Sequence, residues 1–320
     1  MIEIENLYKY YGERRAVGPL SASIQAGEIV GLLGLNGAGK TTTLRVLACD
    51  LLPTSGSVKV GGFDVVEQPH EVRGKVGYLP DRPPVYDDMT VEEYLAYAAR
   101  LKRVSAAAVG ARVKDVLGMC ELGEVRGMLV GTLSHGFRQR LGIAQGIVHK
   151  PAFVVLDEPI SGLDPLQIVE MRNLVRGLRG DHTVVVSSHI LHEISETCDR
   201  ILVIQDGEIR WSGTEADLAT QIGKGMRVRL TVRVPGATED AAKERASTLV
   251  QGVEGVRTVE AQPAAEPGEG IVSLEVTSDS DLRDALCRAL VKAELGVLEV
   301  ARLRDLEATF RALLAKDGAS

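Results

Sequence analysis

The sequence feature that most restricts the fold is the glycine-rich segment Gly34–Thr41 (Gly-Leu-Asn-Gly-Ala-Gly-Lys-Thr), which fits the pattern GxxxxGK[ST] at every fixed position. Before it, Ile29–Leu33 is an apolar run typical of a buried strand, and after it Thr42–Ala48 is typical of a helix. Glycines let backbone N–H groups turn inward around phosphate oxygens, and a helix N-terminus adds partial positive charge. Strand, loop and helix together predict an α/β fold that binds a nucleoside triphosphate.

Single side chains of this phosphate loop have distinct expected roles. Lys40 would reach the β- and γ-phosphates, and the hydroxyl of Thr41 would ligate Mg²⁺. The structural alternative is a glycine-rich turn with a solvated lysine, which the complete pattern and its flanking elements disfavour. The residues predicted to contact the nucleotide here are Gly34, Leu35, Asn36, Gly37, Ala38, Gly39, Lys40, Thr41 and Thr42.

Composition narrows the class of protein. The 320 residues are enough for one large domain and one small one. A formal net charge of −7 argues against a general nucleic-acid binder, which would usually show a basic face. No apolar stretch approaches the roughly 18 residues of a membrane span, and the N-terminus lacks the basic start of a signal peptide. Four scattered cysteines without metal-ligand spacing indicate reduced thiols in a cytosolic protein.

Residues 1 to about 224 alternate strand-like and helix-like segments. Short apolar runs rich in β-branched residues predict strands buried on both faces of a mostly parallel sheet: Ile29–Leu33, Phe153–Leu156, Thr183–Ser187 and Ile201–Ile204. Between them, Thr90-Val-Glu-Glu93 has the pattern of a capping box, and apolar residues recur at helical spacing behind it. We therefore expect a helical subdomain, at about residues 82–146, between the phosphate loop and the next strand.

Residues 225–320 have a different pattern, because Met226–Val234 alternates apolar and polar side chains as a strand with one buried face does. The segments behind it predict the order β-α-β-β-α-β, which is that of a small ferredoxin-like α+β domain. A short helix at about Leu306–Ala315 would follow. Its charged residues are typical of solvated faces and predict no chemistry. The expected elements are helices at about Thr238–Val250 and around Leu282–Leu290, and strands at Val256–Ala261, Ile271–Val276 and Val297–Leu303.

Two carboxylates follow the predicted strand Phe153–Leu156. Asp157 and Glu158 would face the ligand crevice, which lies at the carboxyl ends of parallel strands. Asp157 would hold Mg²⁺, and Glu158 would orient or deprotonate an attacking water. At the end of another strand, His189 could hydrogen-bond a γ-phosphate. Each group alone also fits a structural strand end.

Further motifs resemble those of the ATP-binding cassette (ABC) ATPases, in the same order along residues 1 to about 220. Leu133–Arg140 is similar to the LSGGQ signature of that family, and Pro159–Asp164 to its D-loop. His189 falls at the position of the switch histidine of the family. Tyr11 falls at that of the aromatic residue that stacks on adenine, although a packed surface aromatic is the alternative. The resemblance implies a P-loop NTPase cassette, with a mostly parallel sheet, a β subdomain and a helical subdomain, that hydrolyses ATP with Mg²⁺.

The same resemblance implies a composite site. Cassettes of this family pair head to tail, so Ser134 and the Gly136 backbone would contact the γ-phosphate held by a second cassette, and Asp164 would link the two sites. Since the chain has one phosphate loop and one signature, we expect a homodimer or a pairing with another cassette.

Some positions depart from the usual family pattern. Asp81 stands where most cassettes have a Gln; an aspartate can bind Mg²⁺ but is a poorer hydrogen-bond donor to water. His135 and Phe137 replace a Gly and the Gln of the signature, and Ile160 stands where Thr is common. The segments Gly77–Leu95 and Leu133–Pro151 look most like the bacterial exporter cassettes of the gliding-motility and type-2 systems.

The expected function is therefore that of the ATPase subunit of an ABC exporter, cytoplasmic and peripheral on the inner face of the cell membrane, powering a separate membrane permease. Asp81–Asp88 would be the permease docking surface, with a structural loop as the alternative.

A soluble cassette acting on ribosomes or DNA is the second hypothesis for the function. The single phosphate loop, the absence of heptads and the acidic net charge disfavour it. A kinase or transferase is disfavoured by the signature and D-loop. The C-terminal domain would either stabilise a dimer or regulate it.

Overall fold

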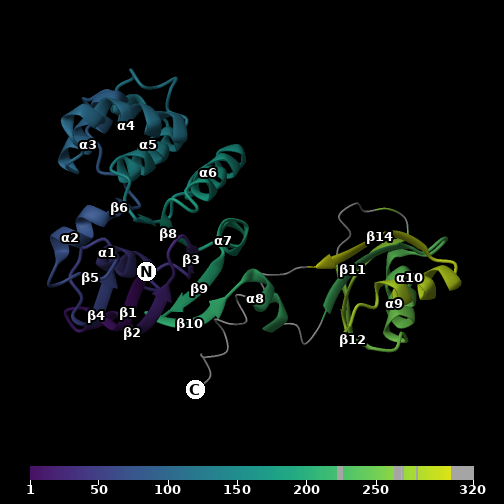
Figure 1. Cartoon of the computed structure of the whole chain (residues 1–320). Coiled ribbons are helices and arrows are strands. Elements are labelled where there is room, and N and C mark those ends of the chain that lie inside the picture. The colour runs from purple at the N-terminus through teal and green to yellow at the C-terminus, as the bar shows by residue number, and fades with distance from the viewer. Residues whose placement is uncertain (222–225, 263–267, 269, 279, 304–320) are drawn as a thin grey trace. The chain divides into compact units, whose positions relative to one another are not determined.

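The structure is a computed structural model that describes residues 1–221, 226–262, 268, 270–278 and 280–303 (Figure 1). The chain divides into two compact units, Met1–Glu215 and Ala216–Ser320. The terminal helix predicted at Leu306–Ala315 lies outside the described residues. Among the helices within them, none is long and apolar enough to cross a membrane.

A six-stranded sheet organises the first unit, with the strand order β10-β9-β3-β8-β7-β6. All neighbouring pairs are parallel except β10 with β9, and every residue of β3, β7 and β8 is buried. The predicted buried strands are thus confirmed. Because β3, β8 and β7 are neighbours, their carboxyl ends meet at one edge of the sheet. The strands are β3 (Ile29–Leu33), β6 (Val76–Leu79), β7 (Phe153–Leu156), β8 (Thr183–Ser188), β9 (Arg200–Gln205) and β10 (Glu208–Gly213).

A second, antiparallel sheet has the order β2-β1-β4-β5. Its inward-facing apolar residues, such as Leu7 and Leu20, share one hydrophobic core with Leu44 of α1 (Lys40–Leu47) and with residues of β3, β7, β8 and β9. This sheet corresponds to the expected β subdomain. Its strands are β1 (Ile2–Tyr11), β2 (Arg14–Ile24), β4 (Ser55–Val60) and β5 (Phe63–Asp64).

The helical subdomain is formed by three helices that lie together in Figure 1, α3 (Val91–Leu101), α4 (Ala106–Met119) and α5 (His135–Ile147), with a 3₁₀ turn at Val130–Thr132. The predicted capping box starts α3: the Thr90 side chain accepts from the Glu93 N–H, and the Glu93 carboxylate accepts from the Thr90 N–H. The other helices of residues 1–221 are α1 (Lys40–Leu47), α2 (Pro69–Lys75), α6 (Pro165–Gly177), α7 (Leu191–Thr197) and α8 (Glu215–Gln221).

The second unit has the predicted element order, and its antiparallel sheet has the strand order β12-β13-β11-β14. Val228, Leu230 and Val232 of β11 are buried in one core with apolar residues of both helices, as the alternating pattern predicts. The elements are β11 (Met226–Arg233), α9 (Glu239–Gln251), β12 (Val256–Gln262), β13 (Ile271–Ser278), α10 (Arg283–Lys292) and β14 (Gly296–Leu303).

Candidate functional site

The phosphate loop joins β3 to α1 through glycines in conformations that other residues rarely adopt. Gly37 has φ 85° and Gly39, the N-cap of α1, has φ 105°. A Cβ atom on Gly39 would also lie 2.7 Å from the carbonyl oxygen of Ala16. Helix α1 begins at Lys40, two residues before its predicted start, which brings Lys40 and Thr41 into the first turn. The loop therefore presents a helix N-terminus and open backbone to a ligand.

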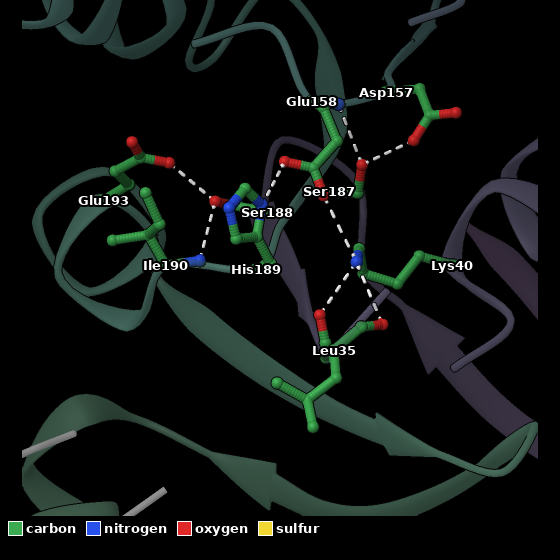
Figure 2. A network of polar contacts seen from close by, with 10 residues as sticks. Leu35, Lys40, Asp157, Glu158, Ser187, Ser188, His189, Ile190 and Glu193 are labelled. Carbon is green, nitrogen blue, oxygen red and sulfur yellow. Dashed lines mark hydrogen bonds and ion pairs between the residues drawn. The ribbon is translucent and has the colours of Figure 1, made fainter. Parts of the chain in front are cut away.

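Lys40 is the cation at the centre of this loop. The side chain is only 6% exposed. Its ammonium donates to the carbonyl oxygens of Gly34 at 2.7 Å and Leu35 at 3.3 Å, and lies 3.2 Å from Oε1 of Glu158 (Figure 2). A buried ammonium held mainly by backbone carbonyls and one carboxylate can exchange these partners for phosphate oxygens.

Glu158 joins the phosphate loop to the strand-end histidine. One carboxylate oxygen pairs with Lys40, and the other lies 3.0 Å from Nδ1 of His189, as Figure 2 shows. The Glu158 backbone N–H donates to Oγ of Ser187 at 2.9 Å. The Glu158 side chain is 14% exposed. It therefore stands at the edge of the solvent, as a group that accepts a proton from water must.

Asp157 has an oxygen free for a cation. Ser187 Oγ donates to its Oδ1 at 2.7 Å, whereas its buried Oδ2 has no hydrogen-bond partner among the described residues. Burial raises the pKa of the Asp157 carboxyl, against the opposing effects of the Ser187 and Thr41 hydroxyls. A cation at Oδ2 would supply the missing partner, so the donor set fits Mg²⁺. Within the described ranges no three His, Cys, Asp or Glu side chains form a metal cluster; Mg²⁺ usually takes few protein ligands and completes its shell with water and phosphate.

Lys40, Glu158 and His189 line a cavity of about 820 Å³, whereas Asp157 is not among the described residues that line it. Most of the residues predicted from the phosphate loop line it, together with Tyr11, Asp81, Glu158 and His189. Tyr11 is 46% exposed, with the Lys9 ammonium 5.5 Å from its ring centroid. The predicted residues that line the cavity are Tyr11, Asn36, Gly37, Gly39, Lys40, Thr41, Thr42, Asp81, Glu158 and His189; Gly34, Leu35 and Ala38 complete the loop behind them.

Three predicted residues lie elsewhere. Ser134, Gly136 and Asp164 are absent from the described residues that line the cavity. Ser134 caps the N-terminus of α5, and Asp164 caps that of α6 by accepting from the Gln167 N–H at 2.9 Å. A Cβ atom on Gly136 would lie 3.0 Å from the Gln167 side chain. The first turns of these two helices are therefore adjacent. The first turn of α5 also reaches the edge of the cavity, because His135 Nε2 lies 2.9 Å from the carbonyl oxygen of Ser161, which lines it.

The cavity also has lining residues that sequence reasoning missed: Arg14, Arg15, Ala16, Ser161 and Asp206. Arg14 is the register partner of Tyr11 across the β1–β2 hairpin. A two-residue turn directly after Tyr11, a predicted nucleotide contact, could therefore have indicated that Arg14 lies near the site. Ser161 lies inside the D-loop-like segment. Asp206 belongs to the turn between β9 and β10, which has no motif to mark it. Sequence reasoning also missed the role of Ser187, which donates to Asp157 and lies two residues before the predicted His189.

Comparisons with known proteins agree with this geometry. The family model described as "ABC transporter" matches residues 17–161. The ABC transporter ATP-binding protein YxlF of Bacillus subtilis (strain 168), itself uncharacterized, is 40% identical over 221 residues, which cover 69% of this chain and 73% of YxlF. The daunorubicin/doxorubicin resistance ATP-binding protein DrrA of Streptomyces peucetius is 36% identical over 253 residues, 79% of this chain and 76% of DrrA.

A solved structure is also similar to this chain. It is a dimeric ATP-binding cassette in a post-hydrolysis state, bound to ADP and Pi. The TM-score is 0.62 at 25% sequence identity, covering 67% of this chain and 98% of that one. The motifs, the geometry of the cavity and these similarities lead to one assignment: the chain belongs to the ABC transporter family, as an ATP-binding, ATP-hydrolysing subunit.

Proposed function

We propose that this chain powers a separate membrane permease, as the ATPase subunit of an exporter at the inner face of the cell membrane. The name of DrrA, a resistance protein, supports export. The observation that carries the catalytic part is the Glu158 carboxylate, which lies between Lys40 and His189. It follows Asp157 in the chain, whose Oδ2 has no hydrogen-bond partner among the described residues. A base and a phosphate-binding cation thereby line one cavity, and the residue before Glu158 in the chain supplies a cation ligand.

Each of these groups has a proposed role in hydrolysis. Lys40 binds the β- and γ-phosphates, and its carbonyl contacts to Gly34 and Leu35 keep it at the mouth of the loop. Glu158 accepts a proton from the attacking water, and His189 hydrogen-bonds the γ-phosphate. Tyr11 stacks on the adenine. Thr41, Asp157 and Asp81 would hold Mg²⁺, which when bound neutralises charge on the phosphate oxygens.

The site is proposed to be completed by a second cassette. Ser134 and Gly136 begin the 13-residue helix α5, whose N-terminus suits an anion, yet they are absent from the residues that line the cavity of their own chain. A head-to-tail dimer would bring this surface over the γ-phosphate of the partner, with Asp164 between the sites. The dimeric state of the similar cassette supports the pairing.

Asp81–Asp88 is the proposed docking surface for the permease. Tyr86 is 53% exposed and packs edge-on against Tyr97, with ring centroids 5.5 Å apart. Asp87 ties this segment to the signature: its carbonyl accepts from the Gly131 N–H at 3.1 Å, and its carboxylate lies 3.4 Å from the Arg138 guanidinium on α5. A displacement of the docking segment would therefore reach α5, the helix that Ser134 caps.

The two regions of the chain receive separate proposed roles. Residues 1–224 would be the nucleotide-binding domain, with the helical subdomain at about 82–146. Residues 225–320 would be an accessory domain of ferredoxin-like type, which the β-α-β-β-α-β order and the strand order β12-β13-β11-β14 support. It would stabilise the dimer or regulate it.

Co-purification from membranes tests the transporter function. The full-length chain should be recovered with a permease containing several apolar segments of about 20 residues each. Tyr86→Glu should release the chain from membranes while the purified variant still hydrolyses ATP, because a charge would enter an apolar contact. The control is Val66→Glu, which alters an equally exposed apolar side chain after β5. Recovery of the wild-type chain only with ribosomes or soluble partners would defeat the proposal.

A further inference from the structure

A buried serine–glutamate pair lies directly behind the strand-end histidine. The Ser188 hydroxyl, at the end of β8, donates to Oε2 of Glu193 at 2.6 Å and accepts from the Ile190 N–H at 3.0 Å (Figure 2). Glu193 is 7% exposed, and its carboxylate points toward the turn that carries His189. These two bonds fix the Ser188 side chain and the backbone on the far side of His189.

The same turn is joined to the phosphate loop on one side and to Glu158 on the other. The Ser188 carbonyl accepts from the N–H of Gly34, the first residue of the phosphate loop, at 3.3 Å. On the other side, Nδ1 of His189 lies 3.0 Å from the Glu158 carboxylate. The side chain of His189 is 41% exposed, so the protein covers only part of its ring. Its position therefore depends on the backbone that Ser188 holds.

Glu193 is the anchor of this turn. A carboxylate loses hydration when it is buried, and short hydrogen bonds to the charged group offset part of that loss. Within the helix that carries Glu193, Thr197 Oγ1 donates to the Glu193 carbonyl at 2.6 Å, which reinforces the last turn of α7. A chain of contacts thus runs from α7 through Glu193 and Ser188 to His189.

We propose that Glu193 is a positioning residue for ATP hydrolysis, which acts through Ser188 to hold the imidazole of His189 toward Glu158 and the γ-phosphate. The inference rests on the proposed roles of His189 and Glu158. Glu193 does not touch the nucleotide, so its removal changes the rate of the chemical step and leaves ATP affinity unchanged.

Steady-state ATPase kinetics of the full-length chain test this role. Glu193→Ala and Ser188→Ala should each lower kcat about tenfold, with KM for ATP changed less than about twofold, because only the placement of His189 is altered. Glu193→Gln should retain most of kcat, since its amide oxygen still accepts from Ser188. Glu196→Ala is the matched control on the same helix, where the carboxylate is 45% exposed and lies 3.8 Å from Arg172; it should leave kcat unchanged.

A double-mutant cycle separates positioning from a general structural effect. In single-turnover reactions, Glu193→Ala should slow the wild-type protein but add nothing in a His189→Ala background. An equal loss in both backgrounds, a raised KM, or a wild-type kcat for both Glu193→Ala and Ser188→Ala would overturn the inference. A wild-type chain that does not hydrolyse ATP, or an active His189→Ala variant with full kcat, would instead defeat the proposed function.

Discussion

At the scale of single residues, the backbone of Glu158 is as informative as its side chain. Its φ of 48° lies in the left-handed region, which costs a residue other than glycine on the order of 1 kcal/mol. The Ser187 hydroxyl oxygen accepts a hydrogen bond from the Glu158 N–H, and Pro159 follows Glu158 in the chain. This turn directs the carboxylate toward Lys40 and His189 instead of leaving it in solvent. Backbone strain of this kind concentrates at functional sites.

Glu158→Gln should preserve ATP binding and lower kcat by about 100-fold or more, since an amide cannot accept the proton of the attacking water. Phosphate release and equilibrium binding of a fluorescent ATP analogue, measured on the same preparation, separate the two effects. Unchanged hydrolysis would remove Glu158 from the role of general base.

Lys40→Ala should act on binding itself, because it removes the ammonium that meets the phosphates. The dissociation constant for ATP should rise at least about tenfold, the equivalent of one charge-assisted hydrogen bond. Lys59→Ala, which removes an exposed lysine of β4, is the control for net charge. Equal affinities for ATP in the two variants would contradict the assignment of the phosphate loop.

At the scale of elements, periodicity and motifs anticipated most of the fold. The apolar runs at β3, β7 and β8 could be predicted because strands buried on both faces have no polar positions. The capping box before α3 was visible because it is local. By contrast, Arg15 and Asp206 line the cavity only because the fold brings their segments to it, and Asp206 lies in the β9–β10 turn. No local sequence pattern predicts such contacts.

One element junction predicts a pH dependence of stability. His149 follows α5, and burial, followed by repulsion from Lys102 at the C-cap of α3, lowers its pKa from 6.5 to about 4. The folded chain therefore binds this proton less tightly than the unfolded chain does. The stability should be unaffected above pH 6.5 and should fall as the pH drops from 6.5 toward about 4.

His149→Gln tests this dependence. The free energy of unfolding, measured by urea denaturation, should fall in both proteins between neutral pH and about pH 5. The decrease should be smaller in the variant than in the wild type, by on the order of 2 kcal/mol. His70→Gln, which replaces an exposed histidine of α2, should follow the wild-type curve. The same pH slope in His149→Gln as in the wild type would exclude His149 as the source.

At the scale of the whole molecule, one chain carries both the nucleotide cavity and the signature residues Ser134 and Gly136, but these two sets of residues do not form one site within it. Lys40 and Glu158 line the cavity, whereas Ser134 and Gly136 begin a helix that does not, among the residues described. The sequence resemblance predicted both sets of residues and implied their pairing across a dimer. Within one chain, Ser134 and Gly136 are not among the described residues that line the cavity, and the proposed composite site would need a second molecule.

The most direct test is the oligomeric state of Glu158→Gln in ATP, measured by analytical ultracentrifugation. With Mg²⁺ and ATP the variant should sediment as a dimer, and with ADP as a monomer, because uncleaved γ-phosphate would remain bound between the loop and the opposite signature. Replacing Ser134 by Arg in the same variant should prevent the dimer. A variant that binds ATP but stays monomeric, together with a wild-type turnover per chain that is independent of protein concentration, would contradict a composite site.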